Sequence, residues 1–275
     1  MNIVCIGAHP DDAEVFAGGV MTLFARDEHN VLAVSLTNGD IGHHEMGGGA
    51  LAQRRMRESQ AAAEIGGYES LTLSNHDGEL TADLELRRAV TRIIREQKAD
   101  IVFTHRPNDY HPDHRYAAIA VQDAAFMVTV PQFCPDTEAL RRNPVFLYLF
   151  DPFTFPAPFR ADVAVSVDAV MNVKWRLLHA MPSQFYEWLP WLDGALDRVP
   201  PASNETARLT WLENYYRPLL ELPATHARDA LHAWCGDAAR GVHFAEVFQV
   251  CEYGAQPERD ILKRMFSFSD NIIGA

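Results

Sequence analysis

The sequence predicts an α/β protein with a Rossmann-like, mostly parallel sheet, helices on both faces and a C-terminal, largely helical extension. Short apolar, β-branched runs alternate with segments of helical periodicity in the first half of the chain. These runs are apolar at nearly every position, which is typical of strands that are buried on both faces. Because strands that alternate with helices pair in parallel, their carboxyl ends should meet at one edge, where such sheets bind ligands.

Four expected strand–helix units make up this first half. Apolar and β-branched residues mark the strands, and apolar residues that recur every three or four positions mark the helices. The expected strands cover 2–7, 30–36, 70–73 and 100–104, and the expected helices cover 13–28, 51–65, 83–97 and 113–127. The Gly-rich segment 38–50, after the second strand, is interpreted either as a mobile lid or as a plain surface loop.

The second half of the chain is less regular. Strands are expected over 144–150 and 161–167, then a helix over 168–181, a mostly helical stretch over 183–240 and a last strand over 242–253. Since the sequence contains neither an internal repeat nor a linker, we expect residues 1–275 to form a single domain, in which about 183–240 could form a helical cap. Aromatic clusters at 185–191 and 211–222 favour a helical core over an oligomer interface or a wall of a substrate pocket.

Charge and composition bound the class of protein. The chain has 24 basic and 37 acidic residues and a net charge of −13, which argues against binding to nucleic acid or to an anionic membrane surface. No apolar run is long enough to predict a transmembrane helix, and the N-terminus lacks the features of a signal peptide. The four cysteines are widely spaced, which is typical of reduced thiols, so a cytoplasmic protein is expected.

The turn after the first expected strand carries polar residues that suit metal binding. Residues 7–12 read Gly-Ala-His-Pro-Asp-Asp, where a dinucleotide-binding sheet would carry a glycine fingerprint. His9 and Asp12 are three positions apart, so both side chains can converge on one zinc or ferrous ion. Asp11 can then take a proton from a metal-bound water. A helix N-cap would explain one of the two Asp residues, but not His9 and Pro10 as well.

A second polar motif, residues 105–118, follows the fourth expected strand. His111 and His114 are spaced i, i+3, with Pro112 at an expected first helical position, so the two rings share one helix face. Either histidine could complete a three-ligand site with His9 and Asp12. Asp113 could accept a hydrogen bond from a ring nitrogen and fix the tautomer. The alternative is a polar surface turn with solvated histidines.

The two motifs follow strands of the same expected parallel sheet, and this coincidence is the stronger argument. Both motifs should therefore lie at the carboxyl edge of the sheet. Three protein ligands and one open coordination position are typical of a catalytic metal site rather than a structural one. A cation at this place would also offset the charges of two adjacent carboxylates.

At these residues the sequence resembles the LmbE-like (PIG-L) superfamily of zinc-dependent deacetylases. Its signature, A-H-P-D-D-E and H-P-D-H, is similar to residues 8–14 and 111–114, with Ala13 inserted before the acidic Glu14. Further segments that resemble the family are 37–40, 55–66, 77–80, 174–184 and 244–248, so the likeness covers nearly the whole chain. No family motif matches about 185–240.

The resemblance implies a role for each residue of the two motifs. Asp11 would be the general base, and His111, oriented by Asp113, would stabilise the oxyanion or protonate the leaving amine. Zinc would be held by three ligands: His9, Asp12 and His114.

Two further residues match family positions that hold sugar groups, Arg55 and Asp77. The alternative for Arg55 is a helix-surface salt bridge with Glu58, and the alternative for Asp77 is a turn before Gly78. Three more matches receive no chemical role beyond packing or hydrogen bonding: Lys174, His179 and Gln184.

The expected function is that of a zinc-dependent N-deacetylase, a hydrolase that removes an acetyl group from an N-acetylglucosaminyl-type conjugate. Zn²⁺ is the expected cofactor and Fe²⁺ the alternative, because both take these ligands. The expected partner is a small amino-sugar substrate, and relatives suggest a homo-oligomer. Two other functions stay open: a non-haem iron enzyme with a 2-His-1-carboxylate site, and a non-catalytic sugar-binding relative.

Overall fold

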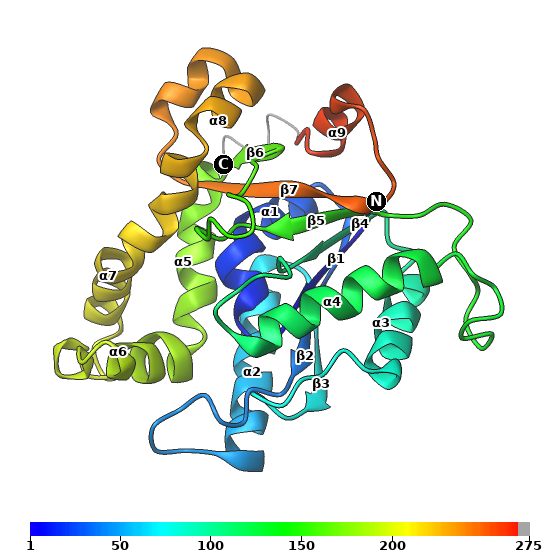
Figure 1. Cartoon of the computed structure of the whole chain (residues 1–275). Coiled ribbons are helices and arrows are strands. Elements are labelled where there is room, and N and C mark those ends of the chain that lie inside the picture. The colour runs from blue at the N-terminus through cyan, green and yellow to red at the C-terminus, as the bar shows by residue number, and fades with distance from the viewer. Residues whose placement is uncertain (269–275) are drawn as a thin grey trace.

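A seven-stranded sheet in the order β3-β2-β1-β4-β5-β7-β6 runs through the computed structural model, which describes residues 1–268 (Figure 1). The first five strands in the chain pair with one another in parallel, and β7 is antiparallel to both β5 and β6. The strands are β1 (Asn2–Gly7), β2 (Asn30–Thr37), β3 (Glu69–Asn75), β4 (Ile101–Thr104), β5 (Val145–Leu149), β6 (Val163–Ser166) and β7 (Ala245–Gly254). The predicted mostly parallel α/β sheet is therefore confirmed.

Helices cover both faces of this sheet, as the sequence predicts (Figure 1). They are α1 (Asp12–Arg26), α2 (Gly48–Gly66), α3 (Leu84–Glu96), α4 (Pro112–Met127), α5 (Met171–His179), α6 (Leu189–Leu192), α7 (Glu205–His226), α8 (Arg228–Cys235) and α9 (Arg259–Met265). A π-helix, Ser183–Trp188, connects α5 to α6. The short helix α9 was not predicted, and α2 begins inside the segment that was expected to be loop.

Successive side chains of a strand point to opposite faces of the sheet, so the core has one part on each face. In β1, Ile3 and Cys5 pack with α1 and α5, whereas Val4 and Ile6 pack with α3 and α4. All four side chains are at most 1% exposed, which explains why the run is apolar throughout. The sequence signal for a doubly covered strand thus has its physical cause in the helices on either side.

The C-terminal helical extension joins the same core. Phe185 and Tyr186 of the π-helix and Tyr216 of α7 are each at most 5% exposed and belong to the core cluster that includes α1. Much of the aromatic content of this region is therefore core, as its composition favours. Trp188 instead lines a cavity at the carboxyl edge of the sheet. No helix among residues 1–268 has the length and apolarity needed to cross a bilayer.

A buried ion pair fixes α1 to the rest of the molecule. Lys174 of α5 and Glu246 of β7 are 3% and 2% exposed and pair with each other. The ammonium group also donates to the carbonyl oxygen of Val15, and the carboxylate accepts from the amides of Gly19 and Val20 at 2.8 and 2.6 Å. Side chains from two distant elements thus bond directly to the backbone of the helix that follows β1.

We predict that breaking this pair destabilises the fold strongly. Lys174→Met leaves the Glu246 carboxylate buried without its counter-charge, so the free energy of unfolding should fall by about 3–5 kcal/mol in urea denaturation at neutral pH. The control is Arg160→Met, which breaks the exposed Arg160–Asp162 pair and should cost at most about 1 kcal/mol. Equal losses in the two variants would contradict the role given to burial.

Candidate metal centre and active site

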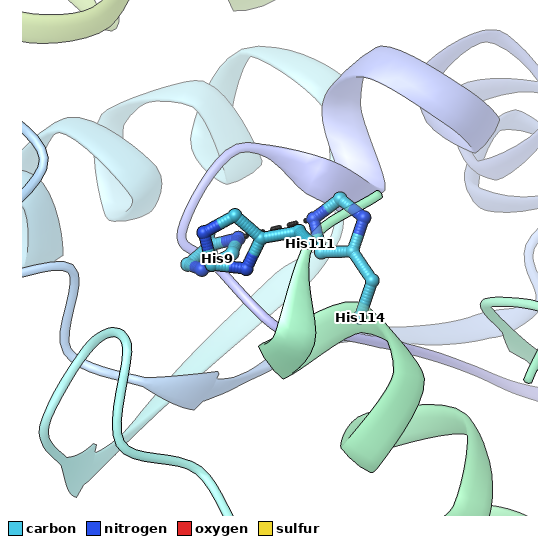
Figure 2. A group of neighbouring side chains, drawn as sticks. All are labelled: His9, His111 and His114. Atoms are coloured by element: carbon cyan, nitrogen blue, oxygen red, sulfur yellow. Dashed lines mark hydrogen bonds between the residues drawn. The ribbon is translucent and has the colours of Figure 1, made fainter. Parts of the chain in front are cut away.

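Four motif residues from two distant parts of the chain meet at the carboxyl edge of the sheet. His9 and Asp12 lie in the turn between β1 and α1, and His111 and His114 lie at the start of α4, which follows β4. Figure 2 shows the ring of His9 against those of His111 and His114, with ring centroids 4.5 and 5.1 Å apart. Because β1 and β4 are neighbours in the sheet, the turns that follow them are neighbours too.

Donor atoms of three residues in this cluster have the spacing of metal ligands. His9 Nδ1 lies 3.2 Å from His114 Nε2. Asp12 Oδ2 lies 3.6 Å from His9 Nδ1, and Asp12 Oδ1 lies 3.4 Å from His114 Nε2. Donor atoms that lie about 2.0–2.1 Å from a tetrahedral zinc ion are themselves about 3.3–3.4 Å apart. The donor set therefore fits a divalent zinc or ferrous ion, with His9, Asp12 and His114 as the residues that could hold it.

The outer nitrogens of the two histidines face carboxylates. His9 Nε2 lies 3.1 Å from an oxygen of Asp77 and 3.5 Å from one of Asp113. His114 Nδ1 lies 3.1 Å from an oxygen of Asp109. Carboxylates behind metal-ligating histidines orient the rings and fix the tautomer, so this second layer also suits a metal centre.

The carboxylates also dominate the electrostatics of the cluster. Burial lowers the pKa of His9, but the carboxylates, led by Asp113, outweigh it and hold this pKa well above its usual value. Burial likewise lowers the pKa of His114, and Asp12 and Asp109 raise it to about 9. A site that draws protons to its histidines in this way also attracts a cation.

Asp12 is the most heavily bonded carboxylate of the site. One oxygen accepts hydrogen bonds from the backbone amides of Ala8 and His9, each at 2.8 Å, and lies 3.0 Å from His105 Nε2. Burial raises the pKa of Asp12, but His114 and His105 outweigh it and hold this pKa well below its usual value. Asp12 is therefore ionised, as a metal ligand must be.

Asp11 and Arg55 form a second part of the site. Asp11 occupies the N-cap position of α1, but its side chain makes no capping hydrogen bond. It pairs instead with Arg55, whose Nη2 lies 3.0 Å from Asp11 Oδ1. Arg55 is 2% exposed, and it is the preceding Arg54 that pairs with Glu58. The arrangement favours a site role for Arg55 over the alternative of a helix-surface salt bridge.

Asp77 also faces the site rather than the surface. It is 5% exposed and lies 3.8 Å from Arg55 Nη1, in addition to its contact with His9. The turn that follows uses Gly78, whose φ of +81° favours glycine. Asp77 thus lies at the cavity, as predicted, and it also contacts His9, a candidate metal ligand.

The carboxylate of Asp113 lies elsewhere than the sequence predicts. It was expected to orient His111, but it accepts hydrogen bonds from the amides of Gly78 and Leu80 and approaches His9. The start of α4 is the cause: His111 is the N-cap, and its Nδ1 accepts from the backbone N–H of Asp113 at 3.2 Å. Asp113 orients His111 through its backbone, while its side chain points toward the β3–α3 turn.

Sequence reasoning missed two residues of the site, His105 and Asp109. His105 is 3% exposed and touches Asp12, and its ring stacks on that of His114 at 4.0 Å. Asp109 contacts His114 and accepts from the amide of His111 at 2.9 Å. Both lie in the second motif, directly after β4, so their position in the sequence could have indicated a place in the site. Their contacts could not be predicted from the sequence.

A cavity of about 620 Å³ opens from this cluster. Ile41 and Gly42 of the segment 38–47 line this cavity, so the segment is more than a plain surface loop. It is tied to the π-helix by His43 Nε2, 2.8 Å from Glu187, and by Gln184, which donates to the carbonyl oxygen of Gly42 at 3.1 Å. Candidate metal ligands, Asp11, Arg55 and this loop therefore face one shared space.

Comparison with known proteins identifies the family. The model of the PIG-L family, described as GlcNAc-PI de-N-acetylase, matches residues 4–125. The chain is 30% identical over 202 residues to the diacetylchitobiose deacetylase of Thermococcus kodakarensis, over 70% of this chain and 74% of that protein. The protein belongs to the PIG-L (LmbE-like) family, which confirms the resemblance found in its sequence.

Solved structures share the fold over nearly the whole chain. The N,N'-diacetylchitobiose deacetylase of Pyrococcus horikoshii has a TM-score of 0.70 and 21% identity, over 90% of this chain and 83% of that one. GalB, the 4-carboxy-2-hydroxymuconate hydratase of Pseudomonas putida, has a TM-score of 0.72 and 20% identity, over 94% of this chain and 99% of that one. Since these two proteins perform different reactions, the fold alone does not determine the chemistry.

Beneath the metal motif lies one more buried carboxylate, that of Glu14. It is 1% exposed and accepts a hydrogen bond from the hydroxyl of Tyr68 at 3.2 Å. Burial raises the pKa of Glu14 from 4.5 to about 7, helped by the charge of Asp11. Between these two pH values the folded protein holds a proton that the unfolded chain has released, so stability falls as the pH rises.

We predict that Glu14→Gln removes this loss of stability with rising pH. In metal-free protein the variant should be more stable than the parent at pH 8 by about 3 kcal/mol, and the difference should disappear by about pH 4. Urea denaturation between pH 4 and pH 8, with both curves fitted to one slope, measures it. A constant difference across this range would show that Glu14 does not carry the shifted pKa.

Proposed function

We propose that the protein is a metal-dependent hydrolase that removes the acetyl group from an N-acetylated amino-sugar conjugate. The observation that carries the proposal is the convergence of His9, Asp12 and His114 beside Asp11 and His111 at one cavity. Membership of the PIG-L family and the likeness to diacetylchitobiose deacetylases support the substrate class. A hydratase function, as in GalB, has only the fold in its favour.

A zinc or ferrous ion, when bound by His9, Asp12 and His114, would supply Lewis acidity that lowers the pKa of water and polarises the acetyl carbonyl. Asp77, Asp109 and Asp113 contact the outer nitrogens of His9 and His114 and would hold these rings in place for the ion. The protein's own contribution is thus a set of ligands whose directions are fixed before substrate arrives.

Asp11 is placed to act as the general base. Its Oδ1 pairs with Arg55, which leaves Oδ2 to take the proton of the attacking water. Burial raises the pKa of Asp11, more than Arg55 lowers it, so the carboxylate is more basic than a solvated one. The same oxygen can then deliver the proton to the departing nitrogen, because an amide anion is a very poor leaving group.

His111 is placed to stabilise the negative charge that develops on the acetyl oxygen. Because its Nδ1 accepts the backbone N–H of Asp113, the proton of the neutral ring resides on Nε2. A donor that is aimed at a developing oxyanion is worth about 10²–10³ in rate. The structure of the α4 start thus selects the tautomer that this role requires.

The proposal is tested by a panel of N-acetylated amino sugars assayed for free amine and acetate. Protein loaded with zinc and protein loaded anaerobically with iron should both be compared with metal-free protein, and at least one metal form should release equimolar amine and acetate. Oxygen uptake by the iron form without acetate release would favour the non-haem iron alternative. Metal binding without any turnover on the panel would favour a sugar-binding relative.

Two substitutions separate metal binding from proton transfer. Asp11→Asn should retain about one metal ion per chain, measured by elemental analysis, and lose about 10²–10⁴ in kcat because the base is gone. His114→Ala should lose the metal together with the activity. His232→Ala, an exposed histidine of α8, is the control and should change neither. Full activity of Asp11→Asn would contradict the assignment of the base.

A further inference from the structure

The cavity has two unlike walls, and both reach the histidine cluster. The polar wall consists of Asp11, Arg55 and Asp77, which contact each other and His9. On the other side, His105 packs edge-on against Phe16, with ring centroids 5.8 Å apart. The change from polar to apolar therefore takes place directly at the candidate metal centre.

The second side, called here the apolar wall, comprises Phe16, Phe150, Phe153, Leu219 and Leu222. These side chains come from α1, from the segment after β5 and from α7. Leu219 and Leu222 are 51% and 37% exposed, so the wall reaches the surface along α7. Since hydrocarbon at a cavity surface is stabilised by contact with other hydrocarbon, this wall suits an apolar part of a ligand.

The size of the cavity also exceeds the needs of a single sugar. Pockets of about 300–1,000 Å³ bury most of a drug-sized ligand, and this cavity measures about 620 Å³. An acetyl group and one hexose ring on the polar side leave the apolar wall uncovered. The family match ends at residue 125, so Phe150, Phe153, Leu219 and Leu222 lie in the part of the chain outside that match.

Sugar geometry indicates which substituent faces the apolar wall. In a 2-acetamido sugar, C1 is bonded to the carbon that carries the amide, so a substituent on C1 lies beside the amide. The apolar residues begin beside the histidine cluster, where Phe16 packs against His105. With the amide at the candidate metal centre and ring hydroxyls on Arg55 and Asp77, a C1 substituent is within reach of this wall.

We propose that the substrate carries an apolar aglycone, an alkyl, isoprenoid or aryl group, on its anomeric oxygen, and that the apolar wall binds this group. The proposal rests on the proposed function and deepens it by naming the class of conjugate. The cavity is continuous from the histidine cluster to α7, so one molecule can occupy both ends. The aglycone positions the sugar, and the polar wall and the histidine cluster act on the amide.

The test compares kcat/KM for four substrates: octyl N-acetyl-β-glucosaminide below its micellar concentration, N-acetylglucosamine, diacetylchitobiose and N-octanoylglucosamine. The octyl glycoside should exceed N-acetylglucosamine and diacetylchitobiose by about tenfold or more, because a hydrophobic pocket discriminates about tenfold or better per methylene that it takes up. If kcat/KM for diacetylchitobiose equals or exceeds that for the octyl glycoside, the aglycone proposal fails while the deacetylase function stands. A preference for N-octanoylglucosamine would assign the wall to the acyl chain and overturn the proposal. Release of free amine from none of the four substrates would refute the proposed function itself.

A matched pair of variants tests the wall directly. Leu219→Asp places a charge on the apolar wall, whereas Leu192→Asp makes the same change at a leucine of α6 that is 54% exposed and is not part of the cavity lining. Because both leucines are about half exposed, both variants should fold, which circular dichroism checks. Leu219→Asp should reduce the kcat/KM ratio of octyl glycoside to diacetylchitobiose by about tenfold, and Leu192→Asp should leave the ratio unchanged. An unchanged ratio in Leu219→Asp would reject the apolar wall as the binding surface.

Discussion

The site depends on one buried charge, the carboxylate of Asp12. An isolated carboxylate at this depth would cost several kcal/mol of desolvation. Here the amides of Ala8 and His9, the ring of His105 and the start of α1 all offset the charge. Because these partners come from both β1 and β4, satisfying this one group also fixes the two turns relative to each other. The charge of the adjacent Asp11 is offset separately by Arg55. The two neighbouring carboxylates therefore have different partners and can take different roles.

Buried contacts also hold the turn between β1 and α1 in place. A Cβ atom at Gly7 would come 2.6 Å from the Cβ of Asp12, so only glycine lets the strand end this close to the helix. The Lys174–Glu246 pair forms hydrogen bonds with backbone groups of α1, from Val15 to Val20. Rigid placement of α1 matters because the metal ligands of a catalytic site must keep their directions while substrate binds and product leaves.

In the proposed function, the catalytic groups and the residues that select the substrate lie in different parts of the chain. The candidate ligands and the base lie within residues 4–125, which the PIG-L family model matches. The π-helix and α7 come later in the sequence, and they contribute Trp188, Leu219 and Leu222 to the cavity. Under the proposed function, the same type of centre can serve different conjugates when the later segments differ, as is common where catalytic groups are held by a sheet and pockets by its connections.

Short-range patterns in the sequence determined the strands, the first eight helices in outline and the two polar motifs at the sheet edge. Hydrophobic periodicity and turn residues act between near neighbours, so the sequence reveals them directly. The side chain of Asp113 against Gly78 and Leu80, the contacts of His105 and Asp109, and the Lys174–Glu246 pair were decided only by the tertiary structure. The physical reason is that most of these contacts join residues that lie 33 to 93 positions apart in the sequence, and the others depend on rotamers, so only packing decides which partner a side chain meets.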